Sequence, residues 1–164
     1  MNIAHSLQSI GFLSDFSESV LMYPVTLSIH LTCIALFGGM ILMTNLRLMG
    51  LTFKSLTITE MVTTFRPWKR VGGVVMIATG SLLAASEAEK YAPNPYFWTK
   101  MIVLCLIGVH ALIFRPIVYN RTEELDRSPV IPTTVKAAAI LSLALWTTMF
   151  TMGRLIAYWE GYEQ

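Results

Sequence analysis

Four apolar stretches without a charged residue constrain this 164-residue chain more than any other feature. Val20–Leu46 runs 27 residues without Asp, Glu, Lys or Arg, and shorter stretches of the same kind cover Val71–Ser86, Met101–Phe114 and Ala137–Gly153. About 20 mostly apolar helical residues cross a bilayer core of roughly 30 Å, and snorkelling Lys and Arg side chains extend the shorter stretches to that length. Because a backbone in lipid must satisfy its own hydrogen bonds, each stretch is predicted to be a helix.

The chain is therefore predicted to be all-α: a four-transmembrane-helix bundle with short interfacial helices, in a single membrane domain over residues 1–164. Its composition agrees, because 54% hydrophobic and 13% charged residues are far from the balance of a soluble domain. Pro67 and Pro95 are expected to open the second and third helices, since proline fits the first helical turn, and Asn94 is expected to cap the third. The four expected spans cover residues 20–47, 67–90, 95–118 and 134–159. Two weakly amphipathic segments are expected on the membrane surface, at residues 2–13 and 55–65.

The basic residues predict how the chain is oriented. Of 12 lysines and arginines, nine lie between the first and second spans or around the loop between the third and fourth, which leaves Lys90, Lys100 and Arg154 for the other side. Basic loops stay in the cytoplasm. Both termini are therefore expected outside the cytoplasm, and Asp15 and Glu18 fit a translocated acidic tail. The lipid bilayer is the expected partner, and no nucleic acid is expected.

Two histidines carry the predicted chemistry. His30 and His110 lie near the centres of the first and third spans, which run in the same direction, so their imidazoles are expected at similar depths. Ionisable side chains at mid-membrane are costly and mark function, and two histidines on facing helices of a bundle suit the axial ligation of one haem b. Separate interhelical hydrogen bonds to Ser28, Thr26 or a backbone carbonyl are the alternative. Another metal or a proton relay is a third interpretation.

Two further charged side chains fall within the outer part of the bundle. Arg154 lies about one turn before the aromatic end of the fourth span, and it is expected to pair with Glu87 or to hold a haem propionate or an anionic quinone-like head group. Snorkelling to the head-group region is the alternative for Arg154, and it is the expected behaviour of Lys100. His30, His110 and Arg154 thus form the predicted cofactor-binding set, with both histidines as metal ligands.

Five segments carry a specific pattern that covers most of the chain: YPVTLSIHLTCIALFGGMILMTNLRLMGL (23–51), RPW (66–68), ATGSLLAASEAEKYAPNPYFWTKM (78–101), GVHALIFRPIVYN (108–120) and GRLIAYWEG (153–161). The pattern resembles an uncharacterised family of small bacterial four-helix membrane proteins, whose members typically show a His at the place of His30 and Asn-Pro-x-Phe-x-x-Lys at Asn94 to Lys100. This chain has His110 where many members have Asn, and Arg115 where others often have His. More distantly, the bundle is similar to copper-resistance D proteins and to b-type cytochrome membrane subunits.

The sequence predicts a non-catalytic electron-transfer or anchor subunit of the bacterial inner membrane, which holds haem b and connects a quinone pool to a redox partner. Other membrane or periplasmic redox subunits are expected to bring the soluble donor within reach, because the loops are short. One alternative is a small copper-type transporter, in which His30 and the pairs Met40–Met43 and Met149–Met152 would line a path. The other is a purely structural accessory subunit.

Overall fold

The structure, a computed structural model, describes His5 and residues 9–159. These residues are helical almost throughout and contain no β-strand, which confirms the all-α prediction. Four helices are long: α3 (Met22–Leu48), α4 (Ile58–Ser86), α6 (Pro95–Phe114) and α8 (Thr133–Leu155). The short elements are α2 (Gly11–Glu18), α5 (Ala88–Tyr91), the π-helical turn η1 (Arg115–Tyr119), α7 (Thr122–Arg127) and the 3-10 turn η2 (Ile156–Tyr158).

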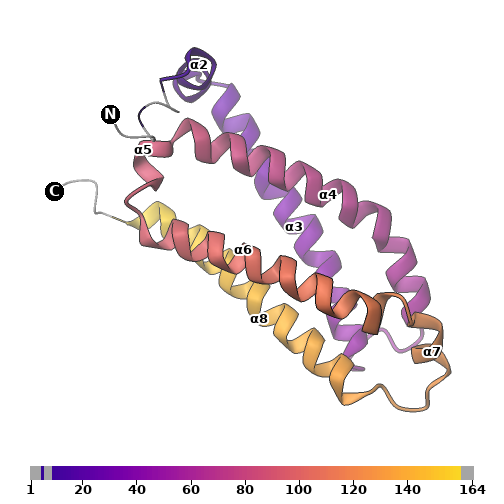
Figure 1. Cartoon of the computed structure of the whole chain (residues 1–164). Coiled ribbons are helices and arrows are strands. Elements are labelled where there is room, and N and C mark those ends of the chain that lie inside the picture. Colours follow the sequence, from indigo (N-terminus) through magenta and orange to yellow (C-terminus); the bar gives the residue numbers. More distant parts are fainter. Residues whose placement is uncertain (1–4, 6–8, 160–164) are drawn as a thin grey trace.

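The long helices lie side by side in the order α4, α3, α8 and α6 (Figure 1). α3 packs against both α4 and α8, and α6 packs against α8. The connection between α6 and α8, which contains α7, lies at one end of the molecule, and α2 lies at the opposite end with the C-terminal part of α8. We refer to these as the α7 end and the α2 end.

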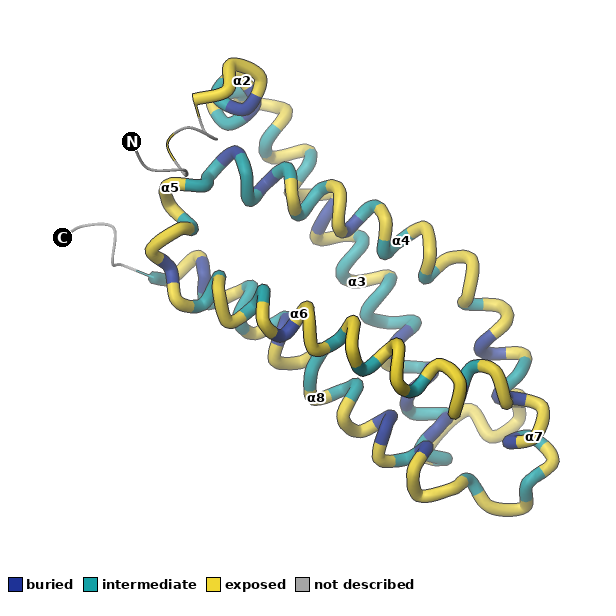
Figure 2. Tube along the Cα trace, in the orientation of Figure 1, coloured by how far each residue is buried: buried dark blue, intermediate teal, exposed yellow. Residues whose placement is uncertain are grey.

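Three helical segments are long and apolar enough to span a membrane: Met22–Leu48, Pro95–Tyr119 and Thr133–Tyr158. Their large apolar side chains are mostly exposed along the middle of the molecule (Figure 2), with Leu36 at 66% and Leu112 at 73%. Exposure on this scale suits contact with lipid. The three segments indicate a membrane protein, and α4 does not join them because Lys69, Arg70 and several small polar residues dilute its apolar run.

α4 differs from the predicted second span of 67–90. It begins at Ile58, passes through Pro67 and ends at Ser86, so that residues 58–65 of the predicted interfacial segment 55–65 are part of the same helix. Proline removes one backbone hydrogen bond from a helix, and the capping of the helix start offsets this loss. Thr57 and Glu60 form a capping box there.

The carboxylate of Asp126 in α7 completes this capped helix start. It accepts the amides of Ile58 at 2.6 Å and Thr59 at 2.9 Å. Burial alone would raise the pKa of Asp126, but hydrogen bonds from Thr59 and Ile58 and the nearby Arg47 charge outweigh it, so the pKa is lowered. α7 therefore fixes the start of α4 from a distance of 68 residues in the chain.

The other boundaries follow local chemistry. α6 begins at Pro95, and the Asn94 side chain accepts the amides of Tyr96 and Phe97. α6 passes into the π-helical η1 at Arg115, beside Pro116, whose missing amide disturbs the regular hydrogen-bond pattern. Of the expected interfacial segment 2–13, residues 2–4 and 6–8 lie outside the described residues, and α2 begins only at Gly11.

The main apolar core lies at the α7 end. It joins α3, α4, η1, α7 and α8 through Leu48, Ile58, Val62, Val118, Leu125, Val135, Ala138 and Ala139. Ile58, Val118, Val135 and Ala139 are each only 1% exposed. The long helices are therefore tied together most tightly at one end.

Candidate functional site

His30 lies buried between α3 and α4. Its Nδ1 is 2.7 Å from Oγ1 of Thr79, and the same Oγ1 is 2.7 Å from the carbonyl of Val75. When Thr79 donates to this carbonyl, it accepts from the N–H at Nδ1, and Nε2 is then a hydrogen-bond acceptor inside the bundle.

Gly80 makes room for this ring. A Cβ added at Gly80 would lie 3.0 Å from Cε1 of His30, which is tighter than most real Cβ contacts, so the ring would have to shift by a few tenths of an ångström. Thr79 and Gly80 are adjacent in α4. The same turn of this helix therefore forms a hydrogen bond with the imidazole and leaves space for it.

Lys100 points into the bundle from α6. Its side chain lies on Gly153 of α8, where an added Cβ would be 3.6 Å from Nζ. Lys100 is the charged group that acts electrostatically on His30, and it forms no ion pair with any carboxylate in the part of the chain that the structure describes. Lys100 is half-buried with its side chain against α8, and its snorkelling toward the head-group region stays a prediction.

His110 faces a different pair of helices. Its Nε2 lies 3.0 Å from the carbonyl of Ala138 on α8, and its ring lies 4.7 Å from that of Phe114. The structure thus places His30 between α3 and α4 and His110 between α6 and α8, and does not bring the two rings together. It matches the alternative of separate interhelical hydrogen bonds, with Thr79 in place of Ser28 or Thr26 as the partner of His30.

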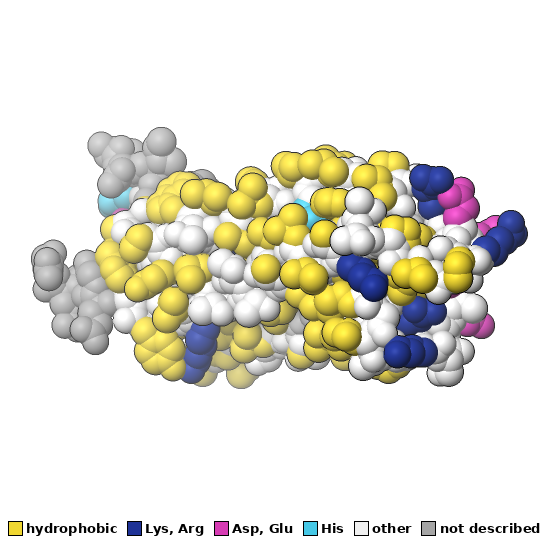
Figure 3. Space-filling model, turned by 90° about the horizontal axis from the view of Figure 1, so that it is seen from below, with side chains coloured by type: hydrophobic (Ala, Val, Ile, Leu, Met, Phe, Trp, Pro, Cys, Tyr) yellow, Lys and Arg dark blue, Asp and Glu magenta, His cyan; other side chains and the backbone are white. Residues whose placement is uncertain are grey.

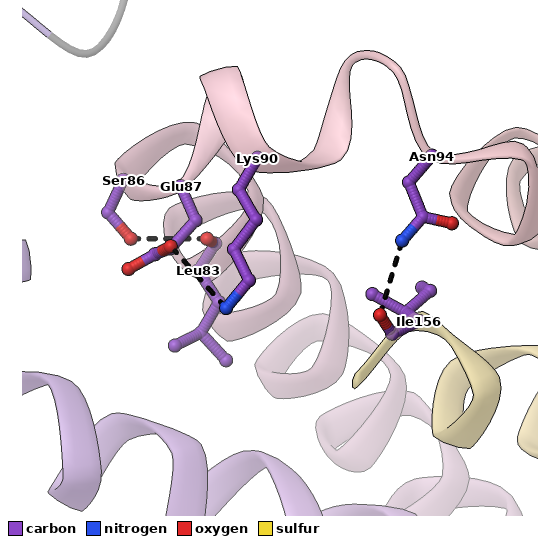
Figure 4. A network of polar contacts seen from close by, with 6 residues as sticks. All are labelled: Leu83, Ser86, Glu87, Lys90, Asn94 and Ile156. Carbon is purple, nitrogen blue, oxygen red and sulfur yellow. Dashed lines mark hydrogen bonds and ion pairs between the residues drawn. The ribbon is translucent and has the colours of Figure 1, made fainter. Parts of the chain in front are cut away.

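Arg154 is exposed and lies at the α2 end. It donates to the Tyr158 hydroxyl at 2.5 Å, and its guanidinium lies 4.9 Å from the centre of that ring. Glu87 pairs instead with Lys90 at 4.0 Å (Figure 4). The predicted pair of Arg154 with Glu87 is therefore wrong. Arg154 binds Tyr158, one helical turn away, and Glu87 binds Lys90.

Asn94 does more than the helix cap that the sequence predicted. Its side chain is fully buried, and Nδ2 donates to the carbonyl of Ile156 at 3.2 Å, which ties the start of α6 to the end of α8 (Figure 4). This contact holds α6 and α8 in register near Lys100 and Gly153. The only sequence signal for it was the Asn94-Pro95 pair, which indicates a cap and not a tertiary bond.

A second polar layer lies nearer the α7 end. Lys69 donates to the hydroxyl of Thr44 at 2.6 Å, and Asn45 donates to the hydroxyl of Ser142 at 3.1 Å. These groups satisfy one another across helix interfaces, as polar side chains in membrane bundles commonly do. No group of three or more His, Cys, Asp or Glu residues that could hold a metal ion occurs within the described residues.

The fold and these contacts define an all-helical membrane protein with polar groups between its helices. The model of DUF6644, described as a family of unknown function, matches residues 9–159, and the chain belongs to this family. The predicted membership of an uncharacterised family is thereby confirmed. No curated protein and no solved structure matches the chain significantly, and the suggested likeness to copper-resistance D proteins and b-type cytochromes has no support.

Proposed function

We propose that this protein is a non-catalytic membrane subunit that holds the head group of a quinone beside His30 and Lys100 and so links a quinone pool to a redox partner subunit. The observation that carries the proposal is the inward-facing ammonium of Lys100, which lies on Gly153 without a carboxylate partner among the described residues. An ionisable group within a membrane bundle is costly and marks a functional site. His30 lies close enough to the Lys100 charge for the two groups to interact electrostatically.

The two side chains are complementary in hydrogen bonding. The Lys100 ammonium is a donor, which suits the carbonyl of a quinone. Nε2 of His30 is an acceptor in the tautomer that donates to Thr79, which suits the hydroxyl of a quinol. The oxidised and reduced head groups therefore each have a matching group. Electrons would have to come from or pass to a redox centre of the partner subunit.

Haem b ligation by His30 and His110 stays a prediction that the geometry does not favour. The two imidazoles face different helix pairs, and Nε2 of His110, an atom that could bind iron, is taken by the carbonyl of Ala138. Both helix pairs would have to repack before one macrocycle could lie between the rings. We therefore propose a site that needs no haem between these residues.

We further propose that α4 crosses the membrane with the three apolar helices, which makes four spans. Its support is its packing along α3, where Gly72 admits Phe37 and Gly80 admits His30. Nine of the 12 Lys and Arg residues lie over 47–70 and 115–136, which are the two connections at the α7 end with the helical segments that flank them. This supports an inner-membrane orientation with that end in the cytoplasm and both termini outside.

Quinone binding by purified protein tests the proposal. A short-chain benzoquinone is titrated against the fluorescence of the four native tryptophans, for the wild type, Lys100→Met and the control Lys54→Met, which removes an exposed loop lysine. Losing one charge-assisted hydrogen bond costs about 1.5–3 kcal/mol, so Lys100→Met should weaken binding roughly ten- to hundredfold and Lys54→Met should not.

Four other results would contradict the proposal in different ways. Equal quinone affinity of Lys100→Met and Lys54→Met would show that Lys100 is not part of the binding site. A split-Soret haem spectrum that disappears in both His30→Ala and His110→Ala would restore the haem hypothesis. Copper uptake by vesicles without quinone binding would favour the transporter, and no effect in any assay would favour a structural accessory subunit.

A further inference from the structure

Each acidic residue at the α7 end forms a hydrogen bond or an ion pair within the protein. Glu60 accepts the amide and hydroxyl of Thr57, and Asp126 accepts the first amides of α4. Glu124 pairs with Arg121 at 2.7 Å, and Glu123 pairs with Arg127 at 3.9 Å. These four carboxylates therefore leave the remaining arginines of this end without an acidic partner.

Three exposed arginines lie in this part of the fold, two on α4 and one at the start of η1. Arg66 and Arg70 are one turn apart on the same face of α4. Arg66 donates to the carbonyl of Tyr119 at 3.3 Å, which brings it to the last residue of η1, the turn that begins with Arg115. Among the described residues none of the three forms an ion pair. Arg66 uses one of its five N–H donors in this bond, so the others are free for an anion.

The surroundings of these arginines are those of the membrane interface. Trp68, 65% exposed, lies between Arg66 and Arg70 in sequence, and tryptophan is enriched at head-group level. Val74 follows Arg70 by one turn on the same face and is 68% exposed. Arg70 is therefore followed, one turn further along α4, by an exposed apolar side chain. On the opposite side of the molecule, which Figure 3 shows, the basic side chains also gather mainly at the α7 end.

We propose that Arg66, Arg70 and Arg115 bind the phosphate of an anionic phospholipid, whose acyl chain runs along α4 past Val74. Guanidinium forks match phosphate oxygens in two-point hydrogen bonds. The apolar strip selects a lipid over free phosphate, because only a lipid fills both parts of the site. This inference is independent of the quinone site, which lies between other helix faces nearer the α2 end.

Lipid retention by the full-length protein provides the test. The protein is purified in detergent, mixed with phosphatidylglycerol or phosphatidylcholine, and its bound lipids are counted by native mass spectrometry. The variant Arg70→Gln/Arg115→Gln keeps the bond of Arg66 to Tyr119. The control Arg121→Gln/Arg127→Gln removes the same charge from arginines that already have glutamate partners. A basic residue near an anionic membrane surface contributes about 1 kcal/mol, which is roughly fivefold in affinity per arginine.

The expected result is a roughly 25-fold loss of phosphatidylglycerol affinity in Arg70→Gln/Arg115→Gln, with the control and phosphatidylcholine binding unchanged. An equal loss in the control would assign the effect to net charge and overturn the site. Inorganic phosphate that competes away the lipid completely would make the site a simple anion site and overturn the lipid assignment. Unchanged affinity in both variants would also overturn it. Far-UV circular dichroism of each variant confirms that the helices are intact.

Discussion

The four long helices pack through different kinds of contact at the two ends of this protein. At the α7 end, apolar side chains such as Ile58 and Val135 close into a core, and Asp126 fixes the start of α4. Toward the α2 end the helix interfaces contain the polar side chains of His30 and Lys100, which contact Gly80 and Gly153. Polar pairs also cross the helix interfaces nearer the α7 end, at Lys69–Thr44 and Asn45–Ser142, but there both partners are protein groups. The comparison shows that apolar packing is concentrated at the α7 end, and we expect binding toward the α2 end.

Removing core volume at the α7 end should have the largest effect. Ile58→Ala creates a cavity at a site that is 1% exposed, and such changes cost about 2–5 kcal/mol of the free energy of unfolding. The control Ile102→Ala removes the same atoms from a side chain that is 61% exposed on α6. Thermal unfolding in detergent should show a large loss for the first and little change for the second. Equal losses would mean that stability is not concentrated at the α7 end.

Filling the glycine beneath His30 should affect the other region. Gly80→Ala places a Cβ 3.0 Å from the imidazole, so the ring must move and its bond to Thr79 weakens. Overpacking of this kind costs about 1–3 kcal/mol. Gly39→Ala is the matched control in α3, because nothing lies within 4 Å of its Cβ position. We expect Gly80→Ala to lower both unfolding temperature and quinone affinity. If Gly80→Ala and Gly39→Ala behave alike, the close contact of His30 with α4 is not important.

Loss of the cap on α4 should have a smaller effect, and one that depends on pH. Asp126→Ala removes the acceptor of two amides and should cost about 1 kcal/mol. Because the pKa of Asp126 is lowered in the folded protein, its contribution is present above the unfolded pKa of about 3.9 and is lost as pH falls through the folded value. The variant should therefore show less acid destabilisation than wild type. Glu123→Ala, an exposed change in the same helix, should leave the acid limb as it is in wild type.

The sequence predicted what depends on local chemistry. The uncharged run around His30 predicted α3, and Asn94-Pro95 predicted the start of α6. The start of α4 at Ile58 also has a local signal, because Thr57 and Glu60 form a capping box there. The prediction placed the start at Pro67 instead, and the second cap at Ile58, the carboxylate of Asp126, is 68 residues away in the chain.

The candidate site was predictable only in part. Mid-membrane position singled out His30 correctly as a buried polar group, but its partner Thr79 and the space at Gly80 depend on how α3 and α4 pack. The same limit applies to Lys100, whose direction follows from a small residue on α8, and to His110, whose partner is a backbone carbonyl. Polar residues in a single sequence indicate depth in the membrane but not which helix they face.

Covalent mapping of the bound quinone tests the central claim most directly. An azido-benzoquinone is photolysed with the purified protein, and the modified peptides are identified by mass spectrometry, with excess unlabelled benzoquinone as the competitor. The account predicts competed labelling of the α3 segment around His30 and of the segments of α6 and α8 around Lys100 and Gly153. Labelling confined to the α7 end, or spread over the lipid-facing helices without competition, would contradict it.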